Sequence, residues 1–290
     1  MGIATNLSFR LESLEVDEPW IVEKMNFEML VEYLQPSSRT SPIAAAQSID
    51  SLTPMKRDFI GTSFGKKEGA ESHMWEIWGL FIAMAKQVPH DHPSMDRLVA
   101  LVYALSELPP TTVKIWTQDT DVWTDLPMLG PSVAEAWIGP ECYWDNLTAE
   151  MKAEWVNFNS FAARLLNHDM VSWYRLTVWS LRNALEKPPR EDLFDCDVAA
   201  AAQWIIHSGV LLFSELEADD AEPVTGRFWP GPLWEEGRSV LSVGRWKFWK
   251  QRFEEISEKE TGPTKSAAEM AKLKMDEIER KGVQKQKSDN

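Results

Sequence analysis

Apolar residues recur along most of this chain at the spacing of an α-helix. The interval i, i+3, i+7, i+10 appears three times, and each set lies along one face of a helix. The three sets are Trp75, Trp78, Ile82 and Ala85; Trp155, Phe158, Ala162 and Leu165; and Trp246, Trp249, Phe253 and Ile256. We expect these residues to pack in a core, because core packing suffices to explain such regular stripes.

Other segments carry the same helical signal. Pro19 suits the first turn of a helix that includes Leu30 and Leu34. Residues 94–107 are a second candidate, and residues 197–216 are apolar on nearly all sides. The last segment therefore predicts a central, buried helix.

Alternating strand patterns are scarce in comparison. Only the stretch TVKIW at 112–116 is a candidate for extended structure. Proline pairs and the acidic stretch at 217–226 separate roughly eight to ten helices of ordinary length. We therefore predict an all-α fold, a single irregular bundle of roughly eight to ten helices with a charged C-terminal tail.

The pattern changes at both ends of the chain and in one internal stretch. Residues 1–18 are expected to form a flexible N-terminus that precedes one helical domain over 19–260. Within this domain, residues 39–70 are poor in large apolar side chains, which predicts a mobile loop. Residues 261–290 lack aromatic residues and carry 7 Lys and Arg against 5 Asp and Glu. We expect this charged tail to be disordered or a single exposed helix.

Tryptophan is unusually frequent, with 15 among 290 residues. Each indole brings a large apolar body and one N–H group that needs a partner when it is buried. Such usage predicts a wide, rigid interior, an aromatic-lined cavity, or both. Five tryptophans lie near chain breaks, where helical periodicity does not account for them. These five are Trp123, Trp137, Trp144, Trp229 and Trp234, and they either pin loops or line a site.

Charge and cysteine content bear on location and partners. The formal net charge is −15, which repels phosphate backbones and anionic membranes, so we expect no nucleic-acid and no membrane partner. The only two cysteines, Cys142 and Cys196, suit a reducing compartment. The N-terminus lacks the pattern of a signal peptide, and no apolar run approaches the length of a bilayer span. An intracellular protein, cytoplasmic or nuclear, is expected.

Two motifs have a functional and a structural interpretation. The sequence GTSFG at 61–65 matches the nucleophile elbow of α/β-hydrolases, but its neighbours do not predict the strand and helix that this motif needs. We interpret it as a glycine-punctuated loop. Residues 245–253 interleave basic and aromatic side chains, as a surface for single-stranded nucleic acid does. The helical period instead places Trp246 and Trp249 on one face and Lys247 and Lys250 toward solvent, and we favour that reading.

A histidine-rich segment is the candidate for a metal site. His90, His92 and Asp96 lie close together in the sequence, and His73 could supplement them, in a combination that suits zinc or iron. Ser94 and Asp96 are better explained as a helix cap and a first-turn charge. We therefore predict no metal and no cofactor.

Polar residues within apolar helical segments are the candidates for a ligand pocket. They are Asn159, Arg164, His168, Trp173, Glu186, Trp204 and His207. Arg164 and Glu186 either form a buried ion pair that bridges two helices or line a polar spot in a cavity. We favour the ion pair, because charged residues in cores are almost always paired.

Five segments taken in order resemble a known family. They are WTDLPMLG (123–130), WVNFNSFAARL (155–165), NALE (183–186), the AAAAQWIIHSG helix (201–209 at its core) and GPLWEEGRSVLSVGRWKFWKQRF (231–253). Their combination resembles a fungal family of helical proteins, domain of unknown function 3632, over roughly residues 70–257. The matching positions are Trp123, Pro127, Asn159, Phe161, Arg164, Trp204, Trp234, Trp246 and Trp249. The resemblance implies an all-helical intracellular protein and brings no activity, cofactor or catalytic residue.

Two functions from different classes follow. No coherent catalytic set is evident, which favours a non-catalytic interaction or scaffold module with a protein partner. The alternative is an enzyme or binding protein for an apolar small molecule, for example in fungal specialised metabolism. Aromatic side chains with a few polar groups are typical of such pockets.

Overall fold

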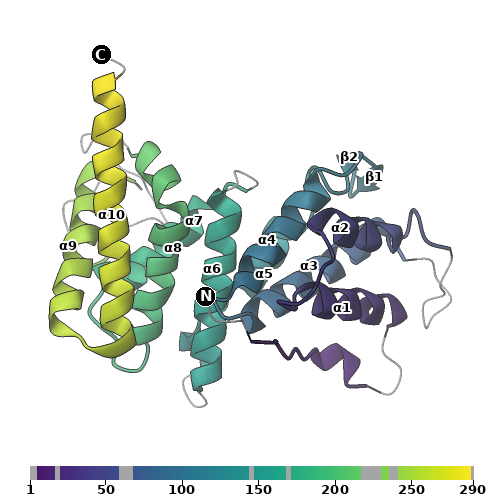
Figure 1. The fold of residues 1–290 in the computed structure, drawn as a ribbon, viewed down its shortest axis with the longest axis horizontal. Coiled ribbons are helices and arrows are strands. Elements are labelled where there is room, and N and C mark those ends of the chain that lie inside the picture. Colours follow the sequence, from purple (N-terminus) through teal and green to yellow (C-terminus); the bar gives the residue numbers. More distant parts are fainter. Residues whose placement is uncertain are drawn as a thin grey trace. The chain divides into compact units, whose positions relative to one another are not determined.

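The computed structural model contains ten α-helices and one two-stranded sheet in the part of the chain that it describes (Figure 1). The described residues are 5–16, 20–58, 68–143, 147–167, 171–216, 230–234 and 241–288. This architecture confirms the all-α prediction. The chain divides into two compact units, Met1–Gly139 and Pro140–Asn290, where the sequence predicts one domain over 19–260.

Unit 1 contains five α-helices and a β-hairpin. Their bounds are α1 (Ile21–Tyr33), α2 (Pro42–Ser51), α3 (Ala70–Gln87), α4 (Pro93–Ser106), β1 (Thr112–Ile115), β2 (Gln118–Asp121) and α5 (Leu129–Ala136), after a short 3₁₀ turn, η1 (Glu12–Leu14). Helix α1 packs against α2 and α3, and α2 packs against α4. Strand β1 confirms the extended stretch predicted at 112–116. It pairs antiparallel with β2, so that Ile115 faces Gln118 across a two-residue turn.

Helix α2 lies where the sequence predicts a mobile loop over 39–70. Ser41 caps the helix, because its Oγ accepts a hydrogen bond from the Ala44 N–H group at 3.2 Å. Ala45 and Ile49 are fully buried. Small apolar residues at helical spacing are therefore enough to hold this helix, and the loop prediction is wrong for its span.

The N-terminal segment predicted to be flexible over 1–18 is bound to unit 1 in its described part. The side-chain amide of Gln35 accepts from the Leu7 N–H at 3.1 Å and donates to the Leu7 carbonyl at 3.0 Å. The side-chain amide of Gln87 likewise accepts a hydrogen bond from the Arg10 N–H and donates one to the Arg10 carbonyl, each at 2.8 Å. Two glutamine side chains thus pair with this backbone as a neighbouring strand would.

Unit 2 is built around a central helix. Its elements are η2 (Pro140–Tyr143, a 3₁₀ turn), α6 (Ala149–Asn167), α7 (Tyr174–Leu181), η3 (Arg182–Glu186, a π-helical turn), α8 (Phe194–Ser214), α9 (Val243–Lys259) and α10 (Gly262–Ser288). Helix α8 packs against α6, α7 and α10, and the buried helix predicted at 197–216 is confirmed.

Helix α8 is also long and apolar enough, by length and composition alone, to cross a membrane. The sequence-based expectation that no segment reaches this threshold is wrong by that measure. However, 67% of its most apolar window is buried inside the protein, and the core helix of a soluble protein passes the same test. The feature is therefore weak evidence for a membrane span.

Helix α10 confirms the single helix that was one of the two predictions for the tail at 261–290, but the prediction that this helix is exposed is wrong. It packs against both α8 and α9 and buries Ala271, Met275 and Ile278. Gly209 of α8 allows this close approach, because a Cβ atom there would lie 2.8 Å from Cδ1 of Ile278. Alanine, methionine and isoleucine at helical spacing supply an apolar face without any aromatic residue.

The three predicted stripes are buried with one exception. Trp78, Trp155, Trp246 and Trp249 are all at most 9% exposed. Trp75 is 40% exposed, so its assignment to the core is wrong. The core face of α3 is centred on Trp78 and its neighbours, and Trp75 lies at the edge of that face.

Candidate functional site

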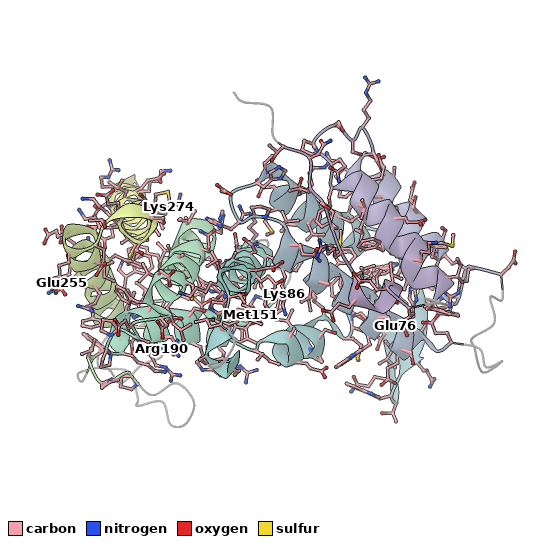
Figure 2. All side chains as sticks on the ribbon, turned by 90° about the horizontal axis from the view of Figure 1, so that it is seen from below. Glu76, Lys86, Met151, Arg190, Glu255 and Lys274 are labelled. Atoms are coloured by element: carbon pink, nitrogen blue, oxygen red, sulfur yellow. The ribbon has the colours of Figure 1, made fainter. Side chains whose placement is uncertain are left out.

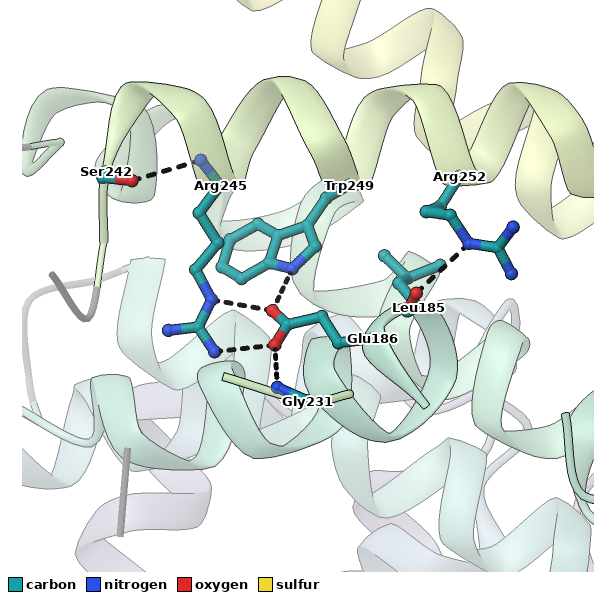
Figure 3. A network of polar contacts seen from close by, with 7 residues as sticks. All are labelled: Leu185, Glu186, Gly231, Ser242, Arg245, Trp249 and Arg252. Carbon is teal, nitrogen blue, oxygen red and sulfur yellow. Dashed lines mark hydrogen bonds and ion pairs between the residues drawn. The ribbon is translucent and has the colours of Figure 1, made fainter. Parts of the chain in front are cut away.

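The carboxylate of Glu186 is completely buried in unit 2 (Figure 3). Its Oε1 accepts hydrogen bonds from Nε of Arg245 and Nε1 of Trp249, each at 2.7 Å. Its Oε2 accepts from Nη2 of Arg245 at 3.0 Å and from the Gly231 N–H at 2.8 Å. Four donors of the protein itself therefore satisfy this charge.

Local sequence features explain how this joint is assembled. Ser242 caps α9 by accepting from the Arg245 N–H at 3.1 Å, and Arg245 and Trp249 follow one helical turn apart on the same face. A Cβ atom on Gly231 would lie 2.3 Å from the Glu186 carbonyl oxygen, so only glycine permits this backbone approach. The NALE, GPLW and RWKFW segments thus meet at one point.

The predicted ion pair between Arg164 and Glu186 is wrong in its partner. Glu186 pairs with Arg245, whose guanidinium is buried, while Arg164 donates to the Ser160 hydroxyl one turn earlier on α6. The sequence contained a usable signal, because Arg245 precedes Trp249 by four residues and so belongs to the buried face of α9. The interpretation of residues 245–253 placed the tryptophans and lysines on opposite sides of the helix and left Arg245 unassigned.

A second buried joint links α6, α7 and α8. The Oδ1 of Asn159 accepts from Nε1 of Trp204 at 2.8 Å and from the hydroxyl of Ser180 at 2.7 Å. Its Nδ2 donates to the Trp155 carbonyl at 2.8 Å. All of these side chains lie in the core. The network fixes three helices against one another, which is a structural role.

The other candidates do not converge on a shared site. The Trp173 indole donates to the Ala162 carbonyl at 3.2 Å, and His207 is half-buried on α8. His168 and the GTSFG segment at 61–65 lie outside the described residues. The polar atoms of the buried candidates already have protein partners, so their role as a ligand lining stays a prediction.

Trp123 is one of the five tryptophans whose positions helical periodicity does not explain, and its contacts hold a loop in place. Its indole is 2% exposed and donates to Oδ1 of Asp50 at 2.9 Å. The Trp78 ring packs edge-on against it at 6.0 Å and donates to the Pro127 carbonyl at 2.7 Å. These contacts hold a loop in which Met128 adopts a left-handed conformation (φ 65°).

The remaining four of that group are placed as follows. Trp234 is half-buried with its ring 5.0 Å from that of Phe248, and Trp137 is half-buried at the end of α5. Trp144 and Trp229 lie outside the described residues.

The histidine segment acts as a helix cap. Nδ1 of His92 accepts from the Ser94 N–H at 3.2 Å, and its Nε2 donates to the Thr5 carbonyl at 3.1 Å. Ser94 is not the cap that the sequence predicts, because its hydroxyl donates to the Leu34 carbonyl instead. Asp96 does lie in the first turn of α4. Among the described residues, no group of three or more His, Cys, Asp or Glu is placed to hold a metal ion.

The two thiols should differ sharply in reactivity. Cys142 is exposed, whereas burial raises the pKa of the Cys196 thiol to about 12. We expect Ellman's reagent to modify one thiol per folded chain, at Cys142, and the second only after unfolding in guanidinium. Rapid modification of two thiols in the folded protein would contradict this placement of Cys196.

A small pocket lies between α1 and α3 in unit 1. It is lined by Val22, Glu23, Asn26, His73, Glu76, Ile77 and Leu80, and it has room for about one water molecule. Asn26 and His73 are each 2% exposed. Neither Oδ1 of Asn26 nor Nε2 of His73 has a hydrogen-bond partner among the described residues. Buried polar atoms in this state are uncommon and call for an explanation.

Several carboxyl groups lie around this pocket, and one of them, Glu76, is labelled in Figure 2. Glu68 pairs with Arg57, and its Oε1 lies 3.6 Å from Nδ1 of His73. Burial acts to raise the pKa of Glu68, but hydrogen bonds from His73 and Arg57 outweigh it and lower that pKa. Loss of water around the Glu76 carboxyl group, reinforced by the Glu68 charge, raises the pKa of Glu76 to about 7. The Arg57 charge acts on both carboxyl groups and opposes the rise in the pKa of each.

Two exposed tryptophans lie on the same side of α3. Trp116, at the turn of the hairpin, is 68% exposed, and its indole donates to Oε1 of Glu71 at 2.9 Å. Trp75 follows Glu71 by one helical turn and is 40% exposed. We call Glu71, Trp75 and Trp116 together the α3 surface. Unit 1 as a whole carries 10 Lys and Arg against 19 Asp and Glu, a net charge of −9.

These observations define a predominantly all-α protein whose buried polar groups join helices and which exposes Trp75 on α3 and Trp116 in the hairpin. The chain belongs to a family described as protein of unknown function (DUF3632), which it matches over residues 78–253. The match spans parts of both units, including the Trp123 loop and both buried joints. No curated protein and no solved structure matches this chain.

Proposed function

We propose that this protein is a non-catalytic, intracellular protein-interaction module that binds its partner on the α3 surface. The observation that carries the proposal is the placement of Trp116. Its large indole is left in water, yet a hydrogen bond to Glu71 holds it in one orientation. Tryptophan is enriched among the residues that supply most of the energy of protein interfaces. A side chain that is already fixed loses less entropy on binding.

The backbone of Trp116 supports the same interpretation. Its φ of 53° lies in the left-handed region, where glycine and asparagine are the usual residues of a two-residue hairpin turn. Holding a bulky residue there costs on the order of 1–3 kcal/mol. Strain of this kind is typical of functional positions, and here it directs an aromatic side chain outward from the turn.

The interior of unit 2 supports a non-catalytic role. The buried polar groups around Glu186 hydrogen-bond to one another, and so do those around Asn159. Each of the two networks joins helices. Two free cysteines without a disulfide are typical of reducing compartments, which supports an intracellular location.

Affinity purification tests this proposal. The tagged wild-type protein should recover a stoichiometric partner, and Trp116→Ala should lose it. A tryptophan at the centre of an interface is worth about 2 kcal/mol or more, which is roughly a thirtyfold change in Kd. Quantitative mass spectrometry of parallel purifications gives the ratio for each recovered protein.

The matched control is Leu273→Ala, which removes an apolar side chain that is 64% exposed from α10 in unit 2. Both variants should unfold within about 0.5 kcal/mol of the wild type, because exposed substitutions are usually near neutral. The proposal fails if the wild type is purified alone as a monomer. It also fails if Trp116→Ala keeps every partner that Leu273→Ala keeps.

A further inference from the structure

The buried joint of unit 2 shows how a tryptophan and a carboxylate of this protein hold a cation (Figure 3). Trp249 and Arg245 both donate hydrogen bonds to the carboxylate of Glu186. The guanidinium carbon of Arg245 also lies over the Trp249 ring, 5.4 Å from the ring centroid. The arginine is thus held by an ion pair and by the face of the indole together.

Two further indole–carboxylate pairs each hold a lysine. Their members are Trp123, Asp50 and Lys56, and Trp246, Glu279 and Lys250. The indole Nε1 lies 2.9 and 3.0 Å, respectively, from one carboxylate oxygen, and the lysine Nζ lies 2.5 and 2.6 Å from the other oxygen. A carboxylate that accepts an indole N–H therefore still binds a cation, because it has lone pairs to spare.

Trp116 and Glu71 form a fourth indole–carboxylate pair, and it lies on the α3 surface. Nε1 of Trp116 donates to Oε1 of Glu71 at 2.9 Å, as in the other three pairs. No cation pairs with Glu71 in the part of the chain that the structure describes. Both side chains are exposed, so a cation from another molecule has access to the carboxylate and to the ring.

The charge of the neighbouring hairpin favours a cationic ligand. Residues 111–125 carry three aspartates and one lysine. That lysine, Lys114, is paired with Asp119 at 3.6 Å. Asp121 and Asp125 accept hydrogen bonds from a hydroxyl and a backbone N–H, which are neutral donors and leave both negative charges in place. A basic segment is therefore attracted to this side of unit 1, and an acidic segment is repelled.

We infer that Trp116 and Glu71 bind an arginine side chain of the protein partner. The inference rests on the proposed function, because the arginine belongs to the partner that docks on the α3 surface. Its guanidinium takes the role that Arg245 has in the buried joint, since it donates to Glu71 and lies over the Trp116 ring. Arginine fits this exposed pair better than lysine does, because an exposed ion pair alone contributes little and a planar guanidinium also stacks on the open ring.

Short basic peptides test the inference with the full-length protein. We would titrate it near neutral pH and about 0.15 M salt with acetylated hexaarginine and hexalysine amides, which carry equal charge. We expect hexaarginine to bind about fivefold more tightly, the factor that one cation–π contact at an exposed site supplies. Hexaarginine should also shift the indole N–H resonance of Trp116, which is identified by its absence from the spectrum of Trp116→Leu.

Two charge variants locate the ion pair. Glu71→Gln removes the negative charge and keeps an amide oxygen that accepts the Trp116 N–H. The affinity for hexaarginine should fall about threefold, which is within the range for one exposed ion pair. Asp91→Asn is the matched control, because Asp91 lies in an exposed turn beyond the other end of α3, about 24 Å along the helix from Glu71. Salt screens a charge at this distance, so the affinity should change by less than about 1.5-fold.

A third variant locates the contact with the ring. Trp116→Leu keeps an apolar side chain and removes the aromatic face, so its affinities for the two peptides should lie within about twofold of each other. Equal affinities of the wild type for the two peptides would overturn the arginine site. Equal effects of Glu71→Gln and Asp91→Asn would overturn it as well.

The outcome is separable from that of the proposed function. Loss of the partner in Trp116→Ala, together with equal binding of both peptides by the wild type, would overturn the arginine site alone. A preference for hexaarginine that Trp116→Leu removes, in a protein that is purified without any partner, would overturn the interaction role and with it the assignment of the arginine to a partner.

Discussion

Replacing Glu186 with alanine is expected to lower the free energy of unfolding by about 3–5 kcal/mol. The guanidinium of Arg245 is only 1% exposed and would be left in the core without its counter-charge. The N–H groups of Trp249 and Gly231 would lose their acceptor as well. Urea denaturation followed by circular dichroism measures the change. A loss below about 1 kcal/mol would show that water reaches Arg245 and that the joint is not closed.

A charge-free replacement separates the ion pair from its geometry. In the double variant Glu186→Leu with Arg245→Met, neither buried charge remains, and such apolar replacements are often close to neutral. We expect it to recover most of the stability lost in Glu186→Ala. Glu258→Ala on the exposed side of α9 is the surface control and should change stability by less than about 0.5 kcal/mol. A double variant no more stable than Glu186→Ala would assign the loss to the unsatisfied N–H groups.

Most of the fold follows from helical periodicity, but the two helices that differ most from the prediction, α2 and α10, do so for one reason. Both α2 and α10 lie where large apolar residues are rare, and both are held by alanines on a buried face, such as Ala45 and Ala271. An alanine buries little area, so a search for large side chains overlooks it. Close packing between helices, as at Gly209, compensates for this small buried area. Such packing depends on a second helix that is far away in the sequence.

The division of the chain into two units also depends on contacts between residues that are far apart in the sequence. The boundary falls between Gly139 and Pro140, inside the range 19–260 predicted as one domain. The helices on both sides have the same amphipathic pattern, and a pattern within one helix does not say which other helix it packs against.

Pairing of polar residues is harder to predict than their burial. The sequence singles out Asn159, Trp204 and Glu186 as polar groups in apolar surroundings, and all three are buried. Which group meets which is set by tertiary structure, so Arg245 and not Arg164 neutralises Glu186. Periodicity gives the direction of a side chain along its own helix and carries no information about the facing residue.

Helical periodicity did not predict the exposed tryptophans of unit 1 or its pocket. Trp75 fits a core stripe by spacing and is nevertheless 40% exposed, and Trp116 lies in a short strand-turn segment with no helical pattern. The pocket combines residues from α1 and α3 that are about 50 positions apart, such as Asn26 and His73. Only the packing of the two helices brings these groups together.

Trp204→Ala should lower the free energy of unfolding by about 3–5 kcal/mol, a loss comparable to that of Glu186→Ala. Trp204 is fully buried in the central helix α8, so truncation leaves a large cavity that its neighbours fill only in part. It also removes the indole donor at 2.8 Å from Oδ1 of Asn159, which keeps only the hydroxyl of Ser180. Equilibrium unfolding in urea, with the slope of the transition compared between variants, gives the change in stability.

Two milder variants divide that loss between volume and hydrogen bonding. Trp204→Phe keeps much of the ring but has no N–H group, and we expect it to cost about 1–2 kcal/mol, the range for one buried hydrogen bond. Asn159→Leu, which removes the acceptor, should reduce the additional cost of Trp204→Phe in the double variant, because the hydrogen bond is then already absent. If the two changes add independently, the Asn159–Trp204 contact does not couple α6 to α8. A cost of Trp204→Ala below about 1 kcal/mol would instead place the indole at a surface.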